Sequence, residues 1–268
     1  MRGRVLVIAG SDSGGGAGIQ ADIKTISMFD AYAATAITAL TAQNTEGVFG
    51  VLPIPPDFIR RQMEVVLDDI GADAIKTGML HDAAVIEVVA SALQEHAAAV
   101  PLVVDPVMVA KGGARLIEPE AIDALKRLLI ARAEIVTPNL PEAEILCGTT
   151  IGDVAGMRAA GDSLLALGCR AALVKGGHLP GETVFDVLVT GGGVRIWESR
   201  RIATRHTHGT GCTLASAIAA GFAQGLHVEA AVDRARNYVE CAIAGAPGLG
   251  RGHGPLDHAH RLRAGLNG

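Results

Sequence analysis

The sequence predicts an α/β fold with a mostly parallel central sheet and an antiparallel hairpin at its edge. Short apolar runs of strand length alternate with longer segments of helical periodicity, which is the pattern of successive βαβ units. Hydrophobic residues make up 49% of the 268 residues but aromatic residues only 3%, so the core must be aliphatic and closely packed. No linker, repeat or low-complexity tract divides the chain, and we therefore expect a single domain over residues 1–268.

The first half of the chain predicts five strands and four helices. Each strand is a short apolar run that ends in a polar or Gly-containing turn, and one helix opens at Pro55-Pro56, where a missing amide proton does no harm. The predicted strands are residues 5–9, 36–40, 74–77, 102–105 and 134–137, and the predicted helices are residues 19–29, 55–69, 82–96 and 119–132. Open parallel sheets bind ligands beyond the carboxyl ends of their strands, so the turns after these strands are candidate sites.

The second half predicts four more helices, one more buried strand and the edge hairpin. Two β-rich segments on either side of Gly191–Gly193 indicate the hairpin. An Ala-rich pattern after a Gly-Thr-Gly turn indicates the first of the last two helices. The predicted helices are residues 141–147, 154–167, 212–224 and 228–244, and the predicted strands are residues 171–175, 184–189 and 194–202.

Composition and charge exclude several classes of function. The net charge is -5 and no run of Lys or Arg could neutralise a row of phosphates, so we expect no nucleic-acid partner. The four cysteines, Cys147, Cys169, Cys212 and Cys241, form no Cys-x-x-Cys pair, which is typical of a reducing compartment, and we expect a cytoplasmic protein. The apolar run at residues 5–9 is too short for a secretory signal, and no run reaches the roughly 18 residues of a membrane span.

A Gly-rich segment, residues 10–18, follows the first predicted strand. It lacks the Gly-Lys-Ser/Thr ending of a Walker A loop and matches the dinucleotide-binding fingerprint only loosely. A tight turn before a helix would explain such a segment as well as a ligand-binding loop does. Asp22 favours the functional interpretation, because it falls in the first turns of the following helix, where we expect it to face a bound ligand.

The strongest motif is the turn His208-Gly-Thr-Gly-Cys-Thr213, which leads directly into a helix. Gly209 and Gly211 allow the backbone to approach a ligand, and the amides of Gly211 and Cys212 lie at the positive end of the helix dipole, where an anion is stabilised. Phosphoryl transfer depends on positioning and on stabilising charge, so this turn, Thr210 included, is the candidate catalytic element. The alternative is a Gly-rich helix start without a ligand.

Four polar side chains follow the predicted strands. Asp105 and Glu142 offer the hard oxygen ligands that suit Mg²⁺, and Asn139 lies close to Glu142 in the sequence. Asp105 could instead initiate a turn before Pro106, and Asn139 with Glu142 could cap a helix. Lys175 ends a buried strand, where a lysine needs a partner, and a nucleotide phosphate would provide one.

Taken in order, these motifs resemble the ribokinase-like superfamily and, within it, the bifunctional hydroxymethylpyrimidine/phosphomethylpyrimidine kinases of thiamine biosynthesis. The resemblance spans nearly the whole chain and rests on seven segments: residues 9–22, 38–45, 76–80, 104–108, 137–143, 174–178 and 207–213. It implies a three-layer α/β/α sandwich, a homodimer, and two successive transfers of phosphate from ATP with Mg²⁺. The first transfer phosphorylates the hydroxymethyl group, and the second makes the diphosphate.

The resemblance also implies a role for the residues that would hold the pyrimidine. Asp22 and Gln43 would hydrogen-bond the aminopyrimidine, and a Gln side chain suits this role because it offers a donor and an acceptor together. Gly10 would lie close by, and Met79 and Val107 would form apolar walls.

At the nucleotide end, the resemblance assigns Asp105, Asn139 and Glu142 to the metal and the phosphates, and Lys175 to the nucleotide phosphates. Residues 109–113, with their paired glycines, would act as a mobile flap that shields the reaction from water.

Cys212 stands where the sugar kinases of the wider superfamily usually carry an Asp general base, and the pyrimidine kinases resemble this chain in having Cys there. A thiol, with a pKa of about 8.5, needs a lowered pKa before it can take a proton at neutral pH, and the helix terminus would have to lower it. On this hypothesis Cys212→Ser or Cys212→Ala strongly lowers turnover. An unchanged rate would leave the backbone amides as the catalytic element.

Three other functions compete with this interpretation. A pyridoxal-type kinase of the same fold would act on a similar hydroxymethyl group, although Met79 and Gln43 favour the pyrimidine. A ligand-binding or regulatory protein would keep the pocket without catalysis, which the intact catalytic turn disfavours. A hydrolase with Cys212 as nucleophile and His208 as base would need these residues to fold back within reach and a third group to orient the base.

Overall fold

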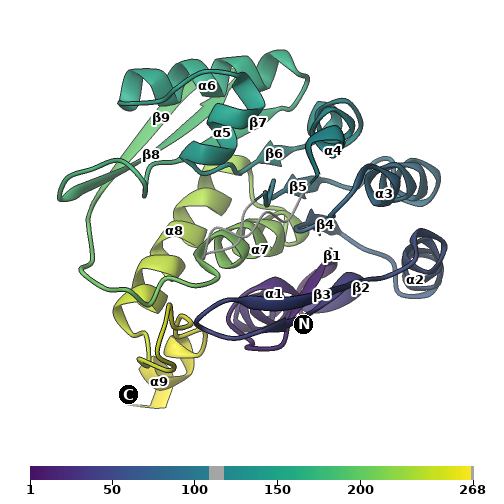
Figure 1. The fold of residues 1–268 in the computed structure, drawn as a ribbon, viewed down its shortest axis with the longest axis horizontal. Helices are drawn as coiled ribbons and strands as arrows, with labels where there is room; N and C mark the ends of the chain where they lie inside the picture. The colour runs from purple at the N-terminus through teal and green to yellow at the C-terminus, as the bar shows by residue number, and fades with distance from the viewer. Residues whose placement is uncertain (109–117, 267–268) are drawn as a thin grey trace.

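Nine β-strands form one continuous sheet in the order β3-β2-β1-β4-β5-β6-β7-β8-β9 (Figure 1). The computed structural model describes residues 1–108 and 118–266. The strands are β1 (Arg4–Asp12), β2 (Tyr32–Gln43), β3 (Val48–Pro53), β4 (Ala74–Thr77), β5 (Leu102–Val104), β6 (Ile135–Val136), β7 (Ala171–Lys175), β8 (Thr183–Thr190) and β9 (Gly193–Arg200). The strands from β2 through β1 to β7 are parallel throughout, which confirms the mostly parallel sheet. The carboxyl ends of these parallel strands therefore lie on the same side of the sheet.

Antiparallel strands close both ends of the parallel run. β7, β8 and β9 are antiparallel, and a tight turn at Gly191 and Gly192 joins β8 to β9, so the predicted edge hairpin is confirmed. At the other end β3 pairs antiparallel with β2, which the sequence pattern did not predict. β3 contains both Gly50 and Pro53 and is exposed along nearly its whole length, so it carries no alternation of buried and exposed residues.

Helices cover both faces of the sheet and complete three layers (Figure 1). On one face lie α1 (Gly18–Met28), α7 (Thr210–Ala223) and α8 (Val228–Ala244). On the other lie α2 (Pro56–Asp69), α3 (Ala83–His96), α4 (Pro119–Ala124), α5 (Leu140–Cys147) and α6 (Val154–Ala166). The short α9 (His260–Leu266), which was not predicted, lies near the C-terminus. Within the described residues, no helix has the length and apolar character needed to cross a bilayer.

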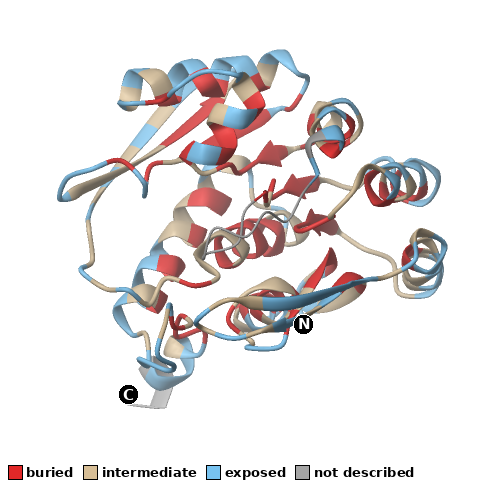
Figure 2. Ribbon diagram, in the orientation of Figure 1, coloured by how far each residue is buried: buried red, intermediate tan, exposed pale blue. Residues whose placement is uncertain are grey.

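The core is built by alternation along the central strands. In β1, Leu6 and Ile8 join the hydrophobic cluster under α2–α6, while Val5 and Val7 join the cluster under α1, α7 and α8. Strand side chains point alternately to the two faces, so a strand buried on both faces is apolar throughout. Figure 2 shows these buried strands and α7 at the centre of the molecule.

Most predicted elements differ from the structure by a few residues at their ends, and two of them differ more in extent or type. The predicted helix 119–132 continues past α4 as a π-helical turn, Leu125–Leu129, and a 3-10 turn, Ile130–Arg132. The predicted strand 36–40 is the middle of β2, which runs from Tyr32 to Gln43 because it pairs with β1 from Tyr32 onward and with β3 at its far end. Strands β4 and β7 and helix α8 begin and end as predicted.

Gly161 sets how closely α6 packs against β8. A Cβ at Gly161 would lie 2.3 Å from Val189 Cγ2 and 2.9 Å from Val189 Cβ. We expect Gly161→Ala to lower the free energy of unfolding by about 1–2 kcal/mol, because overpacking outweighs the gain in helix propensity. Urea denaturation measures this change. Gly152→Ala is the control, because no atom lies within 4 Å of its Cβ position. Equal stability of the two variants would show that α6 can move away from β8 without cost.

Candidate active site

A cavity of about 890 Å³ lies at the carboxyl ends of the parallel strands. Its walls come from the segments that follow β1, β4, β5, β6 and β7, together with the start of α7. Ligands of open parallel sheets bind at this edge, near the point where the strand order reverses, which here lies between β1 and β4. The predicted residues that line the cavity are Gly10, Gln43, Met79, Asp105, Val107, Asn139, Glu142, Lys175, Gly209, Thr210, Gly211 and Cys212.

The Gly-Thr-Gly-Cys turn opens α7 at the cavity wall. Gly209 precedes the helix with a φ of 83°, and a Cβ there would lie 1.8 Å from the carbonyl oxygen of Gly16, so the position requires glycine. The first amides of an α-helix have no acceptor within the helix and carry its partial positive charge. The amides of Gly211 and Cys212 belong to this first turn, which lines the cavity and can therefore bind an anion there.

Lys175 and Asp105 lie directly beside this turn. Lys175 Nζ is 3.3 Å from Asp105 Oδ1, and a Cβ on Gly211 would lie 3.2 Å from that Nζ. Burial lowers the pKa of Lys175, but Asp105 and Glu142 raise it by more, so the amine is protonated. Asp105 is buried, and its Oδ2 has no hydrogen-bond partner among the described residues. Anion-binding amides, a cation and a carboxylate with a spare oxygen therefore meet at one point.

Asn139 and Glu142 cap α5 as well as line the cavity. The Asn139 side chain accepts the Glu142 amide proton at 3.0 Å, and Glu142 Oε2 accepts the Asn139 amide proton at 2.8 Å. The capping that the sequence left open as an alternative is thus present. Burial raises the pKa of Glu142 to about 7; Lys175 opposes this rise and Asp105 adds to it. A second cation near Glu142 would favour its ionised form.

The structure corrects the expected position of Asp22. Asp22 is fully buried on α1 and is not among the residues that line the cavity, so it does not face the mouth. Its two carboxylate oxygens each lie 3.0 Å from Lys76 Nζ, and Oδ1 accepts a hydrogen bond from Ser216 at 2.6 Å. Burial lowers the pKa of Lys76, but Asp22, Cys212 and Asp105 together raise it by more. Lys76 reaches the cavity wall instead, and Asp22 keeps it charged and in place.

The Cys212 thiol is protonated at neutral pH in this structure. Burial raises the pKa of Cys212 to about 12, although the nearby Lys76 ammonium opposes the rise. A base at this position would need the helix terminus to lower the pKa, but removal of the thiol from water raises it instead. In this state Cys212 is not a base. The hydrolase alternative is weakened too, because the thiolate is the nucleophilic form and the raised pKa disfavours it. Asp12 Oδ2 lies 2.8 Å from His208 Nε2 and could orient that histidine, so this contact alone does not argue against the alternative.

The residues expected to hold the pyrimidine also line the cavity. A Cβ on Gly10 would lie 3.4 Å from Met79 Sδ, so the glycine leaves room beside the methionine. Gln43 ends β2, where its side-chain amide lies beside Thr41 and His208. The segment 109–113, expected to act as a flap, lies outside the described residues.

Sequence reasoning gave no role to Lys76 or Asp12, and it considered His208 only as the base of a hydrolase. Lys76 carried the same signal as Lys175, since a lysine inside a short apolar strand implies a buried partner. Asp12 accepts hydrogen bonds from three amides of the Gly-rich segment and faces His208, 196 positions away. No local pattern could pair residues so far apart.

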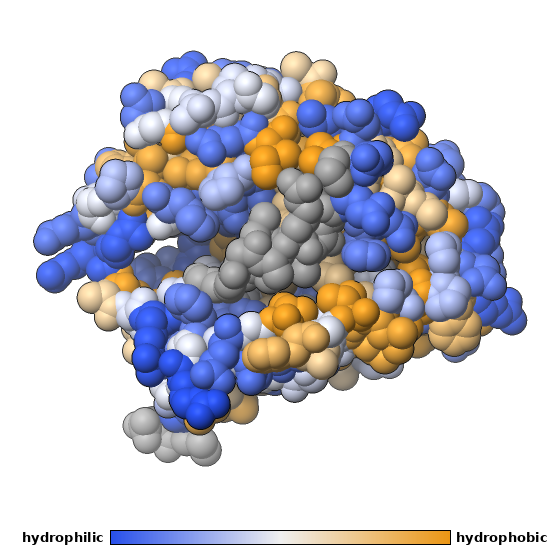
Figure 3. Space-filling view, in the orientation of Figure 1, coloured by the Kyte–Doolittle hydropathy of each residue, from blue (hydrophilic) through white to orange (hydrophobic). Residues whose placement is uncertain are grey.

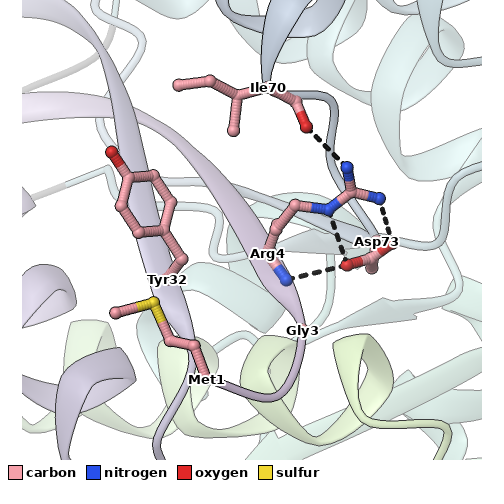
Figure 4. Close-up of a pocket in the computed structure, with 6 residues that line it drawn as sticks. All are labelled: Met1, Gly3, Arg4, Tyr32, Ile70 and Asp73. Atoms are coloured by element: carbon pink, nitrogen blue, oxygen red, sulfur yellow. Dashed lines mark hydrogen bonds and ion pairs between the residues drawn. The ribbon is translucent and has the colours of Figure 1, made fainter.

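A smaller hollow lies at the amino ends of the parallel strands, where β1 and β2 begin (Figure 4). The Arg4 guanidinium there donates to both carboxylate oxygens of Asp73 and to the carbonyl oxygen of Ile70. Exposed ion pairs of this kind contribute little to stability, and ligands of parallel sheets bind at the other edge. We assign no ligand to this hollow.

Known proteins resemble the chain over almost all of its length. Residues 12–257 match the family model described as phosphomethylpyrimidine kinase. The chain is 51% identical over 257 residues to the thiamine biosynthesis bifunctional protein ThiED of Geobacter sulfurreducens, which covers 96% of this chain but only 52% of that longer protein. It is 46% identical over 265 residues to the hydroxymethylpyrimidine/phosphomethylpyrimidine kinase of Bacillus subtilis, covering 98% of this chain and 97% of the relative.

A solved structure shares the fold closely. The Bacillus subtilis pyridoxal kinase in its ADP complex superposes with a TM-score of 0.91 at 39% identity, covering 98% of this chain and 99% of that one. The three-layer ribokinase-like sandwich is therefore confirmed. Given the family match over residues 12–257 and the two relatives above 40% identity, the chain belongs to the phosphomethylpyrimidine kinase family.

Proposed function

We propose that this protein transfers the terminal phosphate of ATP to the hydroxymethyl group of 4-amino-5-hydroxymethyl-2-methylpyrimidine, and then a second phosphate to the product, in thiamine biosynthesis. One observation carries the proposal. Lys175 and Asp105 lie beside the free amides of the Gly211 turn, at the end of a cavity that Gln43 and Met79 also line. Phosphate stabilisation and recognition of a small heterocycle are thus combined in one cavity.

Different residues of the cavity would bind the pyrimidine ring, the transferred phosphate and the nucleotide. Gln43, Met79, Val107 and Gly10 line the part of the cavity that would hold the pyrimidine ring. The amides of Gly211 and Cys212 would stabilise the negative charge that develops on the transferred phosphate. Lys175 would bind the nucleotide phosphates, with Asn139 nearby. Lys76, held by Asp22, places a second buried cation at the cavity wall.

Mg²⁺ fits the donor set at Asp105 and Glu142. Asp105 has a buried oxygen without a partner among the described residues, and Glu142 keeps lone pairs beyond those used in the helix cap. Outside residues 109–117 and 267–268, no group of three His, Cys, Asp or Glu side chains could hold a metal alone. Mg²⁺ usually takes one or two carboxylates together with phosphates and waters. The chemistry it supplies when bound with ATP is neutralisation of phosphate charge.

A pyridoxal-type kinase activity is the second candidate. The fold match to the Bacillus subtilis pyridoxal kinase favours it, since that enzyme shares 39% of its residues with this chain. We place it second because the family model and the Bacillus subtilis relative at 46% identity carry pyrimidine kinase names, and the relative at 51% identity is named for thiamine biosynthesis.

Turnover of two alcohols tests the proposal. We expect ATP-dependent phosphorylation of the hydroxymethylpyrimidine, followed by conversion of the monophosphate to the diphosphate, in the presence of Mg²⁺. Product formation is followed by phosphorus NMR, with pyridoxal as the competing substrate. Phosphorylation of pyridoxal alone would favour the second candidate, and no turnover of either alcohol would contradict a kinase.

Gly211→Asp tests the anion-binding turn. The new carboxylate would lie beside Asp105 and where the phosphate charge develops, so we expect kcat to fall at least about 1000-fold. Steady-state kinetics measure the change, and circular dichroism verifies the fold. Gly152→Asp adds the same charge at an exposed glycine with no atom within 4 Å of its Cβ position, and should leave kcat unchanged. Fast turnover by Gly211→Asp would rule out the turn as the catalytic element.

Thiol reactivity tests the state of Cys212. Because burial raises its pKa to about 12, we expect iodoacetamide at pH 7.5 to modify Cys212 at least about 100-fold more slowly than the exposed Cys241. Mass spectrometry of peptides gives both rates in one sample. Reactivity should rise with pH, since the thiolate is the reactive form. Equal rates at pH 7.5 would mean that the thiol ionises readily and would restore it as a candidate base.

We also propose a cytoplasmic homodimer built from one domain over residues 1–268. Both halves of the chain contribute strands to the same sheet, which supports one domain. Apolar side chains are exposed on β3 and α2, among them Phe49 at 72%, Leu52 at 63% and Phe58 at 58%, and a partner subunit would cover such a surface. Figure 3 shows hydrophobic residues in the lower half of the view, where Figure 1 places β3 and α2.

A further inference from the structure

The side-chain amide of Gln43 has two polar neighbours within the protein. Its nitrogen lies 3.4 Å from His208 Nε2, and its oxygen lies 3.2 Å from Thr41 Oγ1. The two ends of a side-chain amide have nearly the same shape, so their hydrogen-bond partners decide which end is nitrogen and which is oxygen. Both neighbours of Gln43 have a second hydrogen-bond partner, and that partner fixes what they can donate or accept toward Gln43.

His208 Nε2 cannot accept a hydrogen bond from Gln43. His208 Nε2 lies 2.8 Å from Asp12 Oδ2, and an ionised carboxylate only accepts hydrogen bonds, so Nε2 must carry a proton. Asp12 also accepts amide protons from Gly14, Gly16 and Ala17, which favour its ionised form. That proton is donated to Asp12, and a nitrogen that carries a proton cannot accept one from the Gln43 amide. The partial positive charge of the N–H favours an amide oxygen over an amide NH2 group beside it, so the Gln43 atom that faces His208 should be the oxygen.

Thr41 leads independently to the same conclusion. Its hydroxyl lies 2.8 Å from the carbonyl oxygen of Ser11, which only accepts, so the single hydroxyl proton is used there. Toward Gln43 the hydroxyl oxygen can then only accept. The Gln43 atom that faces Thr41 should therefore be the nitrogen.

We propose that Asp12, His208 and Thr41 are specificity-determining positioning residues, which hold the Gln43 amide with its oxygen toward His208 and its nitrogen toward Thr41. One N–H and one oxygen lone pair then remain for a ligand in a fixed order. This pair matches a heterocycle edge in which a ring nitrogen accepts beside an exocyclic amino group that donates, as in an aminopyrimidine. The inference rests on the proposed function and deepens it.

The fixed orientation explains why a pyridine alcohol would bind less well. A ring that lacks the amino group leaves the Gln43 oxygen without a donor, and a site built to hydrogen-bond a substrate group discriminates strongly against an analogue that lacks it. If the amide could turn freely, it could present either end to the ligand, and this discrimination would weaken. The relay from Asp12 through His208 prevents that rotation.

Two variants remove one partner each. His208→Phe keeps a ring beside Gly16 but removes the N–H group that faces Gln43, and Thr41→Val keeps the shape but removes the acceptor. We expect each to lower the ratio of kcat/KM for the hydroxymethylpyrimidine to kcat/KM for pyridoxal by about 10-fold, mainly through KM for the pyrimidine. Thr41→Ser keeps the hydroxyl and should retain most of the ratio. Lys24→Ala removes a different contact to the Gly-rich segment, to the Gly15 carbonyl oxygen, and should leave the ratio unchanged.

A double-mutant cycle separates positioning from a general structural role. Gln43→Met removes the amide, so adding His208→Phe to it should cause no further loss of the ratio. An additive loss, or an equal fall in kcat/KM for both alcohols, would overturn the proposal. Absence of turnover by the wild-type protein would overturn the proposed function and this inference with it.

The position of the histidine proton can be read without any substrate. Nitrogen-15 NMR of histidine-labelled protein, with the His208 signals identified by their loss in His208→Phe, should show a protonated Nε2. A bare Nε2 would overturn the inference even if the wild-type protein is an active kinase.

Discussion

The site depends on the close contact of two Gly-rich segments that come from opposite ends of the chain. Gly209 lies so near Gly16 that a Cβ would meet its carbonyl oxygen, and a Cβ on Gly16 would lie 2.6 Å from His208 Cδ2. The pair between Asp12 and His208 adds a polar contact at the same place, and the His208 amide donates to the Gly254 carbonyl oxygen. This contact fixes the distance between the turn that would bind phosphate and the loop that follows β1.

Two buried ion pairs then place positive charge in the cavity. Lys76 with Asp22, and Lys175 with Asp105, are each largely withdrawn from water, and such pairs often stabilise a fold no better than apolar residues of the same volume. Their value therefore lies in function rather than in stability. Cations that are already held in position stabilise an arriving phosphate without the cost of reorganising the site during the reaction.

The sequence could identify the residues that the structure brings together around the α7 turn because each of them stands in a short local pattern. The glycines before α7, the lysine at the end of β7 and the aspartate after β5 each stand at a strand end or a helix start, which short-range patterns can identify. The mostly parallel sheet, its edge hairpin and most helices followed from periodicity in the same way, whereas the three-layer arrangement was implied by the family resemblance. β3 did not, because Gly50, Pro53 and its exposed side chains leave no periodic pattern.

What the sequence could not give are contacts made by residues far apart along the chain. Asp22 was expected to face the ligand, yet its partners are Lys76 on β4 and Ser216 on α7, and only the packing of three elements reveals that it is buried. The raised pKa of Cys212 has the same origin, since it reflects burial in the assembled site rather than the helix start alone.

The choice between a pyrimidine and a pyridine alcohol also depends on contacts between residues that lie far apart along the chain. Either substrate needs the same anion-binding turn, the same lysine and the same carboxylate, because the transferred group is a phosphate in both cases. Backbone similarity to a pyridoxal kinase therefore says little about the heterocycle. The distinguishing information lies in a few protons around Gln43, which donate or accept according to Asp12, His208 and Thr41. Because superposition compares backbones and not proton positions, specificity in this fold can change while the sheet, the helices and the phosphate site stay the same.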